Sequence, residues 1–528
     1  MNRILKRANK RISLGGAAGL LMGVAMMGQL LGFLRNRLIS ANFTRIDPGA
    51  SDAFFAAFQI PDFFYYTISA GALGVAFIPF LSDRLEKGDR KGAFELASSL
   101  LNVLMIAMSA VGVIIFIFAG TLINILAPDL PPRNIEQAII IMRLISLNPL
   151  LFTLSGILTS LQQTFGRFFF YAAAPLFYNV SIIVSIFLFR DNIGIIGLGV
   201  GALLGGILQL LVALLGLVGL GFRYRLGIKW KSIQFRSMLR QLPPRSLDQG
   251  VDQVNSLVEI NRAQALGIGH VSHYIYALTL MNVPIMLIGN SIAIAAFPRL
   301  TERLSQNRPD LFRKEFAQIL RAMIWITMPV IVVAYFARGY LARLIFGEVA
   351  PEVALIFGYL TVAILFRIIY SMLSRYFYAH KDTVTPLLVS IFAIGLNIYL
   401  AFTLARPDMY GIAGLAMAQS IVAAVEVAIL GTVMVIRDRQ ILNARFISGI
   451  VRIISVTGFS VLAAYIAVSF LPLQAADRGI VTLGFKLAGI ASATLLVHLG
   501  ISIIFGLNEP KPIVAKVKQL VLKSVRVE

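Results

Sequence analysis

Residues 101–127 read LNVLMIAMSAVGVIIFIFAGTLINILA and contain no charged side chain. A helix needs about 20 mostly apolar residues to cross the roughly 30 Å hydrocarbon core of a bilayer. Comparable apolar runs recur along the whole chain, so the sequence predicts an all-α polytopic membrane protein with about 14 spans. We place these spans near residues 14–40, 52–80, 93–127, 134–161, 168–190, 193–221, 242–266, 273–298, 315–337, 353–379, 385–405, 411–436, 447–471 and 483–506.

The composition and the missing motifs exclude several kinds of functional site. Of 528 residues, 58% are hydrophobic and 14% are charged, whereas soluble domains have about 45–50% apolar and about 25% charged residues. There is no cysteine, which excludes disulfides, thiolate nucleophiles and cysteine metal sites. His270 and His273 are spaced for one helix face, but we predict polar packing there and no metal site. No phosphate-binding loop of the G-x-x-x-x-G-K-[ST] type occurs. We therefore expect a transporter without its own ATPase and without catalytic residues.

The net charge of +22 follows the predicted topology. With a cytoplasmic N-terminus, 32 of the 47 Lys and Arg residues lie in loops on that side, seven lie in the opposite loops and eight lie within spans. By the positive-inside rule this predicts that both termini are cytoplasmic. We expect affinity for anionic lipid headgroups and no binding of nucleic acid.

Two pairs of similar segments indicate an internal duplication. Residues 76–85 and 296–304 close the second and eighth spans at an offset of 220, and residues 194–198 and 411–415 open the sixth and twelfth spans at an offset of 217. Chance similarity of short apolar strings is the alternative. Each repeat has an even number of spans, so the halves share one orientation. We predict an N-terminal six-helix bundle (1–221), a basic cytoplasmic linker (222–245), a second six-helix bundle (246–436, with a first span starting as early as 242), two extra C-terminal helices (437–506) and a cytoplasmic amphipathic tail (507–528).

Charged residues within spans are costly and usually face a polar cavity or a partner. Corresponding spans of the two halves carry charges of both signs, at Arg35, Asp52, Asp248, Asp252, Glu259 and Arg262. They predict a polar chamber for an anionic headgroup between the bundles, and interhelical ion pairing is the alternative. Near span ends, snorkelling to the interface is the interpretation for Asp62, Arg321 and Arg452. Small residues from Gly15 to Gly32 predict close packing of the first span.

The order of several short motifs resembles the MurJ (MviN) family. In the first half the resemblance is carried by residues 32–35, 51–58, 60–61, 71–73, 76–79, 156–158, 168, 174–175 and 178–179. In the second half it is carried by Gln253, residues 276–277, Pro284, residues 377–379, 382–383 and 385–386. Each motif is weak alone, but together they cover both halves with compatible spacing.

This resemblance implies a fourteen-helix member of the multidrug/oligosaccharidyl-lipid/polysaccharide exporter superfamily. It implies flipping of lipid II, the undecaprenyl-pyrophosphate-linked peptidoglycan precursor, to the outer leaflet of a bacterial cytoplasmic membrane by alternating access. The last two helices would form a groove for the lipid tail. Arg35 and Asp52 match charged cavity positions of the family.

The chain also departs from the family pattern. Where well-studied members have basic residues, it has Gln29, Tyr65, Tyr66 and Thr279, and Ala70 replaces an acid. Either Arg262 and Arg367 substitute for the missing cations, or the substrate or the coupling differs.

Three readings remain open at this stage. The first is lipid II translocation, with Asp248, Asp252 and Glu259 as candidate sites for a coupling Na⁺ or H⁺ and with no other cofactor. The second is export of another lipid-linked oligosaccharide or of small cationic compounds, and the third is a non-transporting envelope scaffold. Expected partners are lipid II, membrane lipids and the cell-wall synthesis machinery, and we expect a monomer.

Overall fold

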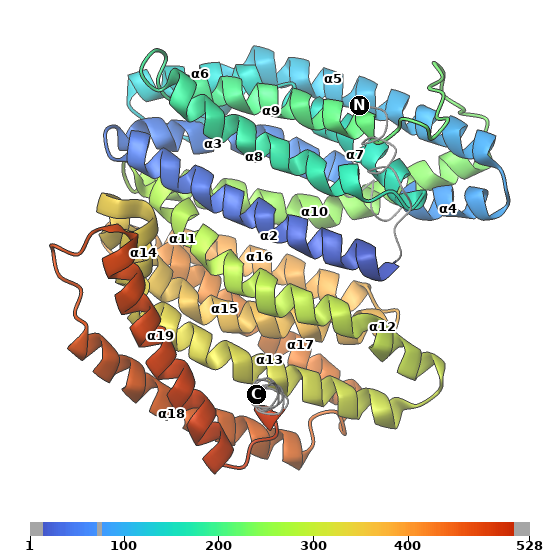
Figure 1. Cartoon of the computed structure of the whole chain (residues 1–528). Coiled ribbons are helices and arrows are strands. Elements are labelled where there is room, and N and C mark those ends of the chain that lie inside the picture. The colour runs from blue at the N-terminus through green and yellow to red at the C-terminus, as the bar shows by residue number, and fades with distance from the viewer. Residues whose placement is uncertain (1–13, 71–76, 512–528) are drawn as a thin grey trace, which may run out of the picture. The chain divides into compact units, whose positions relative to one another are not determined.

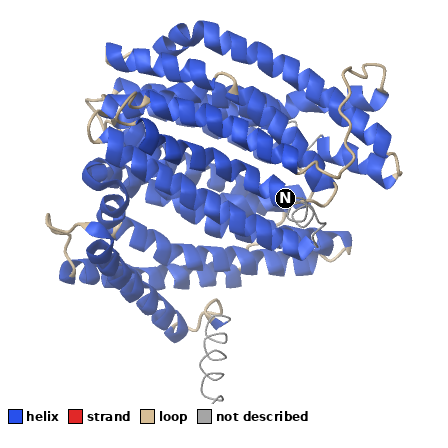
Figure 2. Ribbon diagram, turned by 45° about the horizontal axis from the view of Figure 1, so that its top comes forward, coloured by secondary structure: helices blue, strands red, loops and turns tan. Residues whose placement is uncertain are grey.

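The computed structural model describes residues 14–70 and 77–511. These residues form helices and connecting loops without a strand (Figures 1 and 2). The N-terminal basic segment, residues 71–76 and most of the predicted amphipathic tail lie outside the described residues. The all-α prediction is confirmed. Among the described residues, eleven helical segments are long and apolar enough to span a membrane, and the described parts of the other three predicted spans also fall on helices.

The chain forms two compact units, Met1–Ser272 and His273–Glu528. The helices of the first unit are α2 (Leu14–Ile39), η1 (Ser40–Thr44), α3 (Pro48–Phe64), η2 (Tyr65–Ala70), α4 (Ile78–Glu86), α5 (Arg90–Leu126), α6 (Pro132–Ile145), α7 (Asn148–Thr164), α8 (Phe169–Phe189), α9 (Ile196–Leu215) and α10 (Ile233–Ala265), and α11 (His270–Pro284) starts in it. Those of the second unit are η4 (Ile285–Asn290), α12 (Ser291–Ser305), α13 (Pro309–Phe336), α14 (Arg338–Phe346), η5 (Gly347–Val349), α15 (Ala350–Ala379), α16 (Val384–Leu404), α17 (Ala413–Arg437), α18 (Ala444–Phe470) and α19 (Gly479–Ile504).

Helix α10 is the least apolar of the predicted spans. It begins inside the predicted linker and contacts α3, η2 and α5, so packing groups it with the first unit. The sequence repeat instead groups it with the second bundle. Polar contacts account for this packing, because Ser256 Oγ donates to Gln59 Oε1 of α3 at 3.1 Å and Asn261 Nδ2 donates to the Leu126 carbonyl at 3.0 Å.

Glycines allow α9 to approach α8 closely. A Cβ at Gly197 would overlap Phe189, one at Gly201 would overlap Ser185, and one at Gly205 would lie 3.1 Å from the Tyr178 carbonyl oxygen. These glycines recur every four residues, the spacing of one helix face. The two helices lie side by side in Figure 1. In α2, by contrast, a Cβ at Gly23 or Gly32 would meet no described atom within 4 Å, so the close packing expected there is absent at these positions.

The second and eighth spans each contain a π-helical segment. Segment η2 starts at Tyr65, four residues after Pro61, and η4 starts at Ile285, directly after Pro284. Their starting positions differ by 220 residues, the same offset as the repeated segments at 76 and 296. Proline removes a backbone donor from the helix ladder, which favours a local change of helix type. The structure therefore supports the internal duplication independently of sequence similarity.

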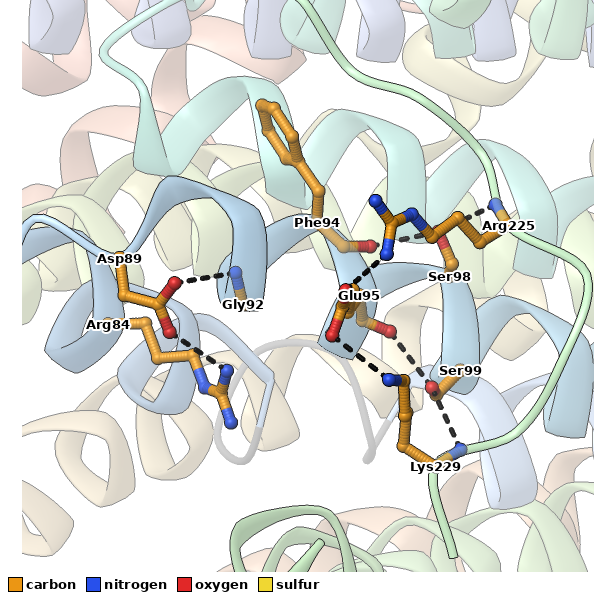
Figure 3. A network of polar contacts seen from close by, with 9 residues as sticks. All are labelled: Arg84, Asp89, Gly92, Phe94, Glu95, Ser98, Ser99, Arg225 and Lys229. Atoms are coloured by element: carbon orange, nitrogen blue, oxygen red, sulfur yellow. Dashed lines mark hydrogen bonds and ion pairs between the residues drawn. The ribbon is translucent and has the colours of Figure 1, made fainter.

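The basic linker is fixed against the N-terminal part of α5 (Figure 3). Glu95 pairs with Arg225 and, at 3.3 Å, with Lys229, while Ser98 and Ser99 accept hydrogen bonds from the backbone nitrogens of the same two linker residues. The carboxylate of one helix thus neutralises part of the linker charge and holds the segment that precedes α10.

Candidate functional site

Arg35 lies in the C-terminal half of α2 and is half-buried. Its Nη1 donates to Asn179 Oδ1 of α8 at 3.1 Å, and its Nε and Nη2 each donate to Asn36 Oδ1 at 3.3 Å. These amide oxygens orient the guanidinium. Asn179 belongs to a motif that the sequence analysis used only for the family resemblance, and the structure gives it a role in positioning Arg35.

Asp62 of α3 lies within electrostatic range of Arg35. It also interacts electrostatically with Tyr65 and Tyr66 of η2 and with Tyr178 of α8. This setting differs from the snorkelling expected for Asp62. Hydropathy gives the depth of a residue in a span but not the side of the helix that it occupies, so the sequence did not reveal this neighbourhood.

Aromatic rings connect this group across three elements. The rings of Tyr65 and Tyr66 meet edge to face with centroids 5.1 Å apart, and Phe152 of α7 contacts both Tyr65, at 5.5 Å, and Tyr178, at 5.0 Å. We call Arg35, Asp62, Tyr65, Tyr66, Phe152, Tyr178 and Asn179 the Arg35 cluster. It combines one cation, one anion and three hydroxyls, and Tyr66 is 41% exposed, so part of the cluster is open to a ligand.

Asp52 is fully buried at the other end of α3. Its carboxylate accepts hydrogen bonds from Gly269 N at 2.5 Å, from Ser272 N at 2.8 Å and from Ser272 Oγ. The Asp52 carboxylate oxygens thus cap the first turn of α11, where free backbone N–H groups and the helix dipole favour an anion. The structure shows a structural role for Asp52, and its predicted role toward substrate stays a prediction.

The candidate ion-coupling residues lie on α10. Glu259 is buried and its Oε1 accepts from Asn255 Nδ2 at 3.0 Å, whereas Asp252 is exposed. The side chain of Asp248 lies outside the described side chains. Arg262, the proposed substitute cation, is half-buried on the same helix. Their participation in coupling remains a prediction.

Arg367 of α15 belongs to a polar network within the second unit. Its Nη1 lies 3.1 Å from Glu426 Oε2 of α17, and its Nη2 donates to Gln419 Oε1 at 3.4 Å. Glu426 is 2% exposed and also accepts from Ser390 Oγ of α16 at 3.0 Å. Arg367 therefore has an anionic partner from its own unit, and the sequence analysis did not foresee that pairing.

The two remaining predicted residues, Gln29 and Thr279, belong to different units. Gln29 is exposed on α2, two turns before Arg35, while Thr279 is half-buried on α11 and donates to the Ile275 carbonyl at 2.8 Å. The structure thus brings together Arg35, Tyr65 and Tyr66, and places Arg367 and Thr279 in the second unit. Among the described residues, no three His, Asp or Glu side chains gather in a way that could hold a metal ion.

The chain matches the family described as lipid II flippase MurJ over residues 48–475. The chain belongs to the MurJ family. The match runs from the start of α3 through α18 and so includes parts of both predicted bundles and the first of the two C-terminal helices, which agrees with the resemblance read from the motifs.

Curated MurJ relatives align with most of the chain. The probable lipid II flippase MurJ of Rhizobium meliloti (strain 1021) is 24% identical over 509 residues, which cover 92% of each protein. That of Vibrio cholerae serotype O1 is 26% identical over 425 residues, covering 77% of this chain and 80% of the relative.

Solved structures share the MurJ fold. A lipid II flippase MurJ in an inward closed conformation superposes with a TM-score of 0.77 and 23% identity, covering 92% of this chain and 98% of that chain. A multidrug resistance MATE family transporter of the MOP superfamily superposes in its inward-facing conformation (TM-score 0.61, 15% identity, covering 83% and 98%) and in its outward-facing conformation (0.57, 17%, covering 84% and 97%). At these identities the structures establish the fold.

Proposed function

We propose that this protein is a lipid II flippase that moves the lipid-linked peptidoglycan precursor from the cytoplasmic to the outer leaflet of a bacterial cytoplasmic membrane. The observation that carries the proposal is membership of the MurJ family over residues 48–475. The same fold is known in inward-facing and outward-facing states of a related transporter, which supports alternating access as the mechanism.

The Arg35 cluster is the proposed contact for the anionic headgroup. Charge-assisted hydrogen bonds from a guanidinium suit pyrophosphate oxygens, and the amide oxygens of Asn36 and Asn179 orient Arg35. Hydroxyls of Tyr65, Tyr66 and Tyr178 can donate to the same ligand. Tyr65 and Tyr66 stand where the family pattern has cations, so this chain would bind the headgroup with fewer formal charges and more neutral donors.

Coupling is proposed to use a monovalent cation, Na⁺ or H⁺, at acidic residues of α10. Glu259 is the strongest candidate, because it is a buried carboxylate on this helix, and carboxylate oxygens can accept a proton or ligate a monovalent cation. Both chain termini are proposed to be cytoplasmic, the protein to act as a monomer, and the cell-wall synthesis machinery to be its partner.

Conditional depletion combined with a leaflet-specific assay for lipid II tests the function. We expect outer-leaflet lipid II to fall on depletion and to recover when the wild-type chain is supplied. Normal outer-leaflet lipid II after full depletion would refute the proposal and favour a scaffold. Accumulation of a different lipid-linked saccharide in the inner leaflet would instead favour export of another lipid-linked oligosaccharide.

A further inference from the structure

A pocket of about 410 Å³ lies within the second unit, between the N-terminal parts of α13 and α18 and the C-terminal end of α19. Its volume falls in the range of small-ligand sites, about 300–1,000 Å³. The polar side chains that line it are Arg321, Arg445, Ser448, Arg452 and Asn508. Three of these five are arginines, and they come from two different helices.

The arginine charges are only partly balanced. Arg321 pairs with Glu509, and its Nε donates to Glu509 Oε1 at 2.6 Å. Arg445 and Arg452 are exposed, and among the described residues neither forms an ion pair. Counted over the described residues, the three arginines and Glu509 give the pocket an excess of about two positive charges.

Gly449 sets the shape of the pocket. A Cβ there would lie 2.7 Å from the Arg321 guanidinium carbon, which is closer than side chains approach without a shift. The glycine thus lets the Arg321 side chain lie across α18 and reach Glu509. This arrangement leaves Arg445 and Arg452, two turns apart on α18, as the unpaired cations of the pocket.

The neighbouring surface of α18 is apolar. Ile447, Val451 and Ile454 are 57%, 58% and 56% exposed, and Arg452 lies about 12 Å along the helix from Ala444. An arginine at this depth, beside exposed aliphatic side chains, is suited to the boundary between headgroups and acyl chains. The loops at this end, 299–314 and 437–445, are rich in Lys and Arg, which assigns the end to the cytoplasmic leaflet.

We infer that this pocket binds the anionic headgroup of a cytoplasmic-leaflet phospholipid, with its phosphate between Arg445 and Arg452 and its acyl chains along Ile447, Val451 and Ile454. Basic pockets between membrane helices on the cytoplasmic side suit such headgroups. The site differs from the Arg35 cluster, which lies in the other unit. It would make the protein's stability depend on the anionic lipid content of the membrane.

The test uses full-length protein in mild detergent and native mass spectrometry to count retained phosphatidylglycerol, with phosphatidylcholine as the zwitterionic probe. The R445Q/R452Q variant removes both unpaired cations. R240Q/R439Q removes the same charge from exposed positions of the basic loops and α10 outside the pocket. We expect R445Q/R452Q to weaken phosphatidylglycerol binding by about tenfold or more and R240Q/R439Q to leave it unchanged. R445K/R452K should restore much of the binding.

Equal retention by R445Q/R452Q and wild type, or equal loss in both double variants, would overturn the inference. Displacement of the lipid by inorganic phosphate alone would also overturn it, because a free anion would then be the ligand. Size-exclusion profiles and melting temperatures establish that each variant is folded. If R445Q/R452Q does not fold, R452Q alone carries the test, with R439Q as its control.

Discussion

At Arg35 and Asp62, two charged side chains of opposite sign share one neighbourhood on adjacent spans, with tyrosine hydroxyls around them. Asp62 could have either of two roles toward Arg35. Asp62 either holds Arg35 in position for an anionic ligand, or it competes with that ligand for the Arg35 guanidinium. Single variants do not distinguish these roles, because each also leaves the other charge without its neighbour.

A double-mutant cycle distinguishes them. We expect R35Q to lower lipid II translocation at least about tenfold, because it removes the charge-assisted donor, a loss of about 1.4 kcal/mol or more. If Asp62 positions Arg35, D62N lowers translocation and R35Q/D62N is no worse than R35Q. The measurement is the rate of lipid II appearance in the outer leaflet of cells or proteoliposomes. R37Q, which changes the exposed arginine two positions later, is the matched control. Equal loss in R35Q and R37Q would refute a specific role for Arg35.

Asp52 carries a prediction about stability. D52N removes the negative charge that faces the first turn of α11, and hydrogen bonds to charged groups contribute about 1.5–3 kcal/mol each. We expect a lower melting temperature of the purified protein, with translocation reduced only in proportion to the folded fraction. A D52N protein of wild-type stability that no longer moves lipid II would instead assign Asp52 to the substrate site.

At the scale of elements, the glycine face of α9 determines how closely it packs on α8. G201V places a branched side chain where the Ser185 side chain and the Ile182 Cα already lie. Overpacking costs about 1–3 kcal/mol, so we expect a clear fall in melting temperature. G458V is the control, since a Cβ at Gly458 of α18 meets no described atom within 4 Å. Equal effects of both variants would show that β-branching, and not the contact, is responsible.

Asp382 determines how α16 begins and adds a pH dependence. It accepts hydrogen bonds from Val384 N and Thr385 N, each at 3.0 Å, and pairs with Arg437 at 2.5 Å. Burial raises the pKa of Asp382, but the hydrogen bonds from Thr385 and Arg437 outweigh it and hold the pKa below its ordinary value. A lowered pKa stabilises the folded state above the unfolded value of 3.8, and this contribution is lost as the pH falls below it. We expect D382N to lower the melting temperature at neutral pH and to have less effect at pH 3, measured by thermal unfolding in detergent.

The sequence predicts the membrane spans well, because the length of an apolar run or the charge of the flanking loops is enough to locate them. Runs of about 20 apolar residues predicted the spans, and helix α10 was found despite its charges because the loop asymmetry required it. The surroundings of Asp62, the Glu426 partner of Arg367 and the cap formed by Asp52 all depend on contacts between distant spans. Apolar periodicity does not encode those contacts, because lipid-facing and helix-facing surfaces are both hydrophobic. The sequence did not predict the π-helical segments either, because a proline predicts a bend in the helix but not the helix type that accommodates it.

At the scale of the whole molecule, the charge asymmetry predicts a single orientation. The chain has no cysteine, so single introduced cysteines are unambiguous reporters. We expect S305C to react with a membrane-impermeant maleimide only after permeabilisation and D408C to react in intact cells. Both positions are exposed, and the cysteine-free parent is the control. Labelling of S305C in intact cells would overturn the assignment of both termini to the cytoplasm.

The matching π-helical segments also bear on the history of the chain. A π-helical turn closes i→i+5 hydrogen bonds, so it accommodates an extra residue within an α-helix, and such turns are rare and frequently lie at functional sites. Segments η2 and η4 begin at positions that differ by 220 residues, the offset of the sequence repeat. A six-span unit that already contained this segment before duplication explains the shared position with one event, whereas separate origins in the two halves would require two.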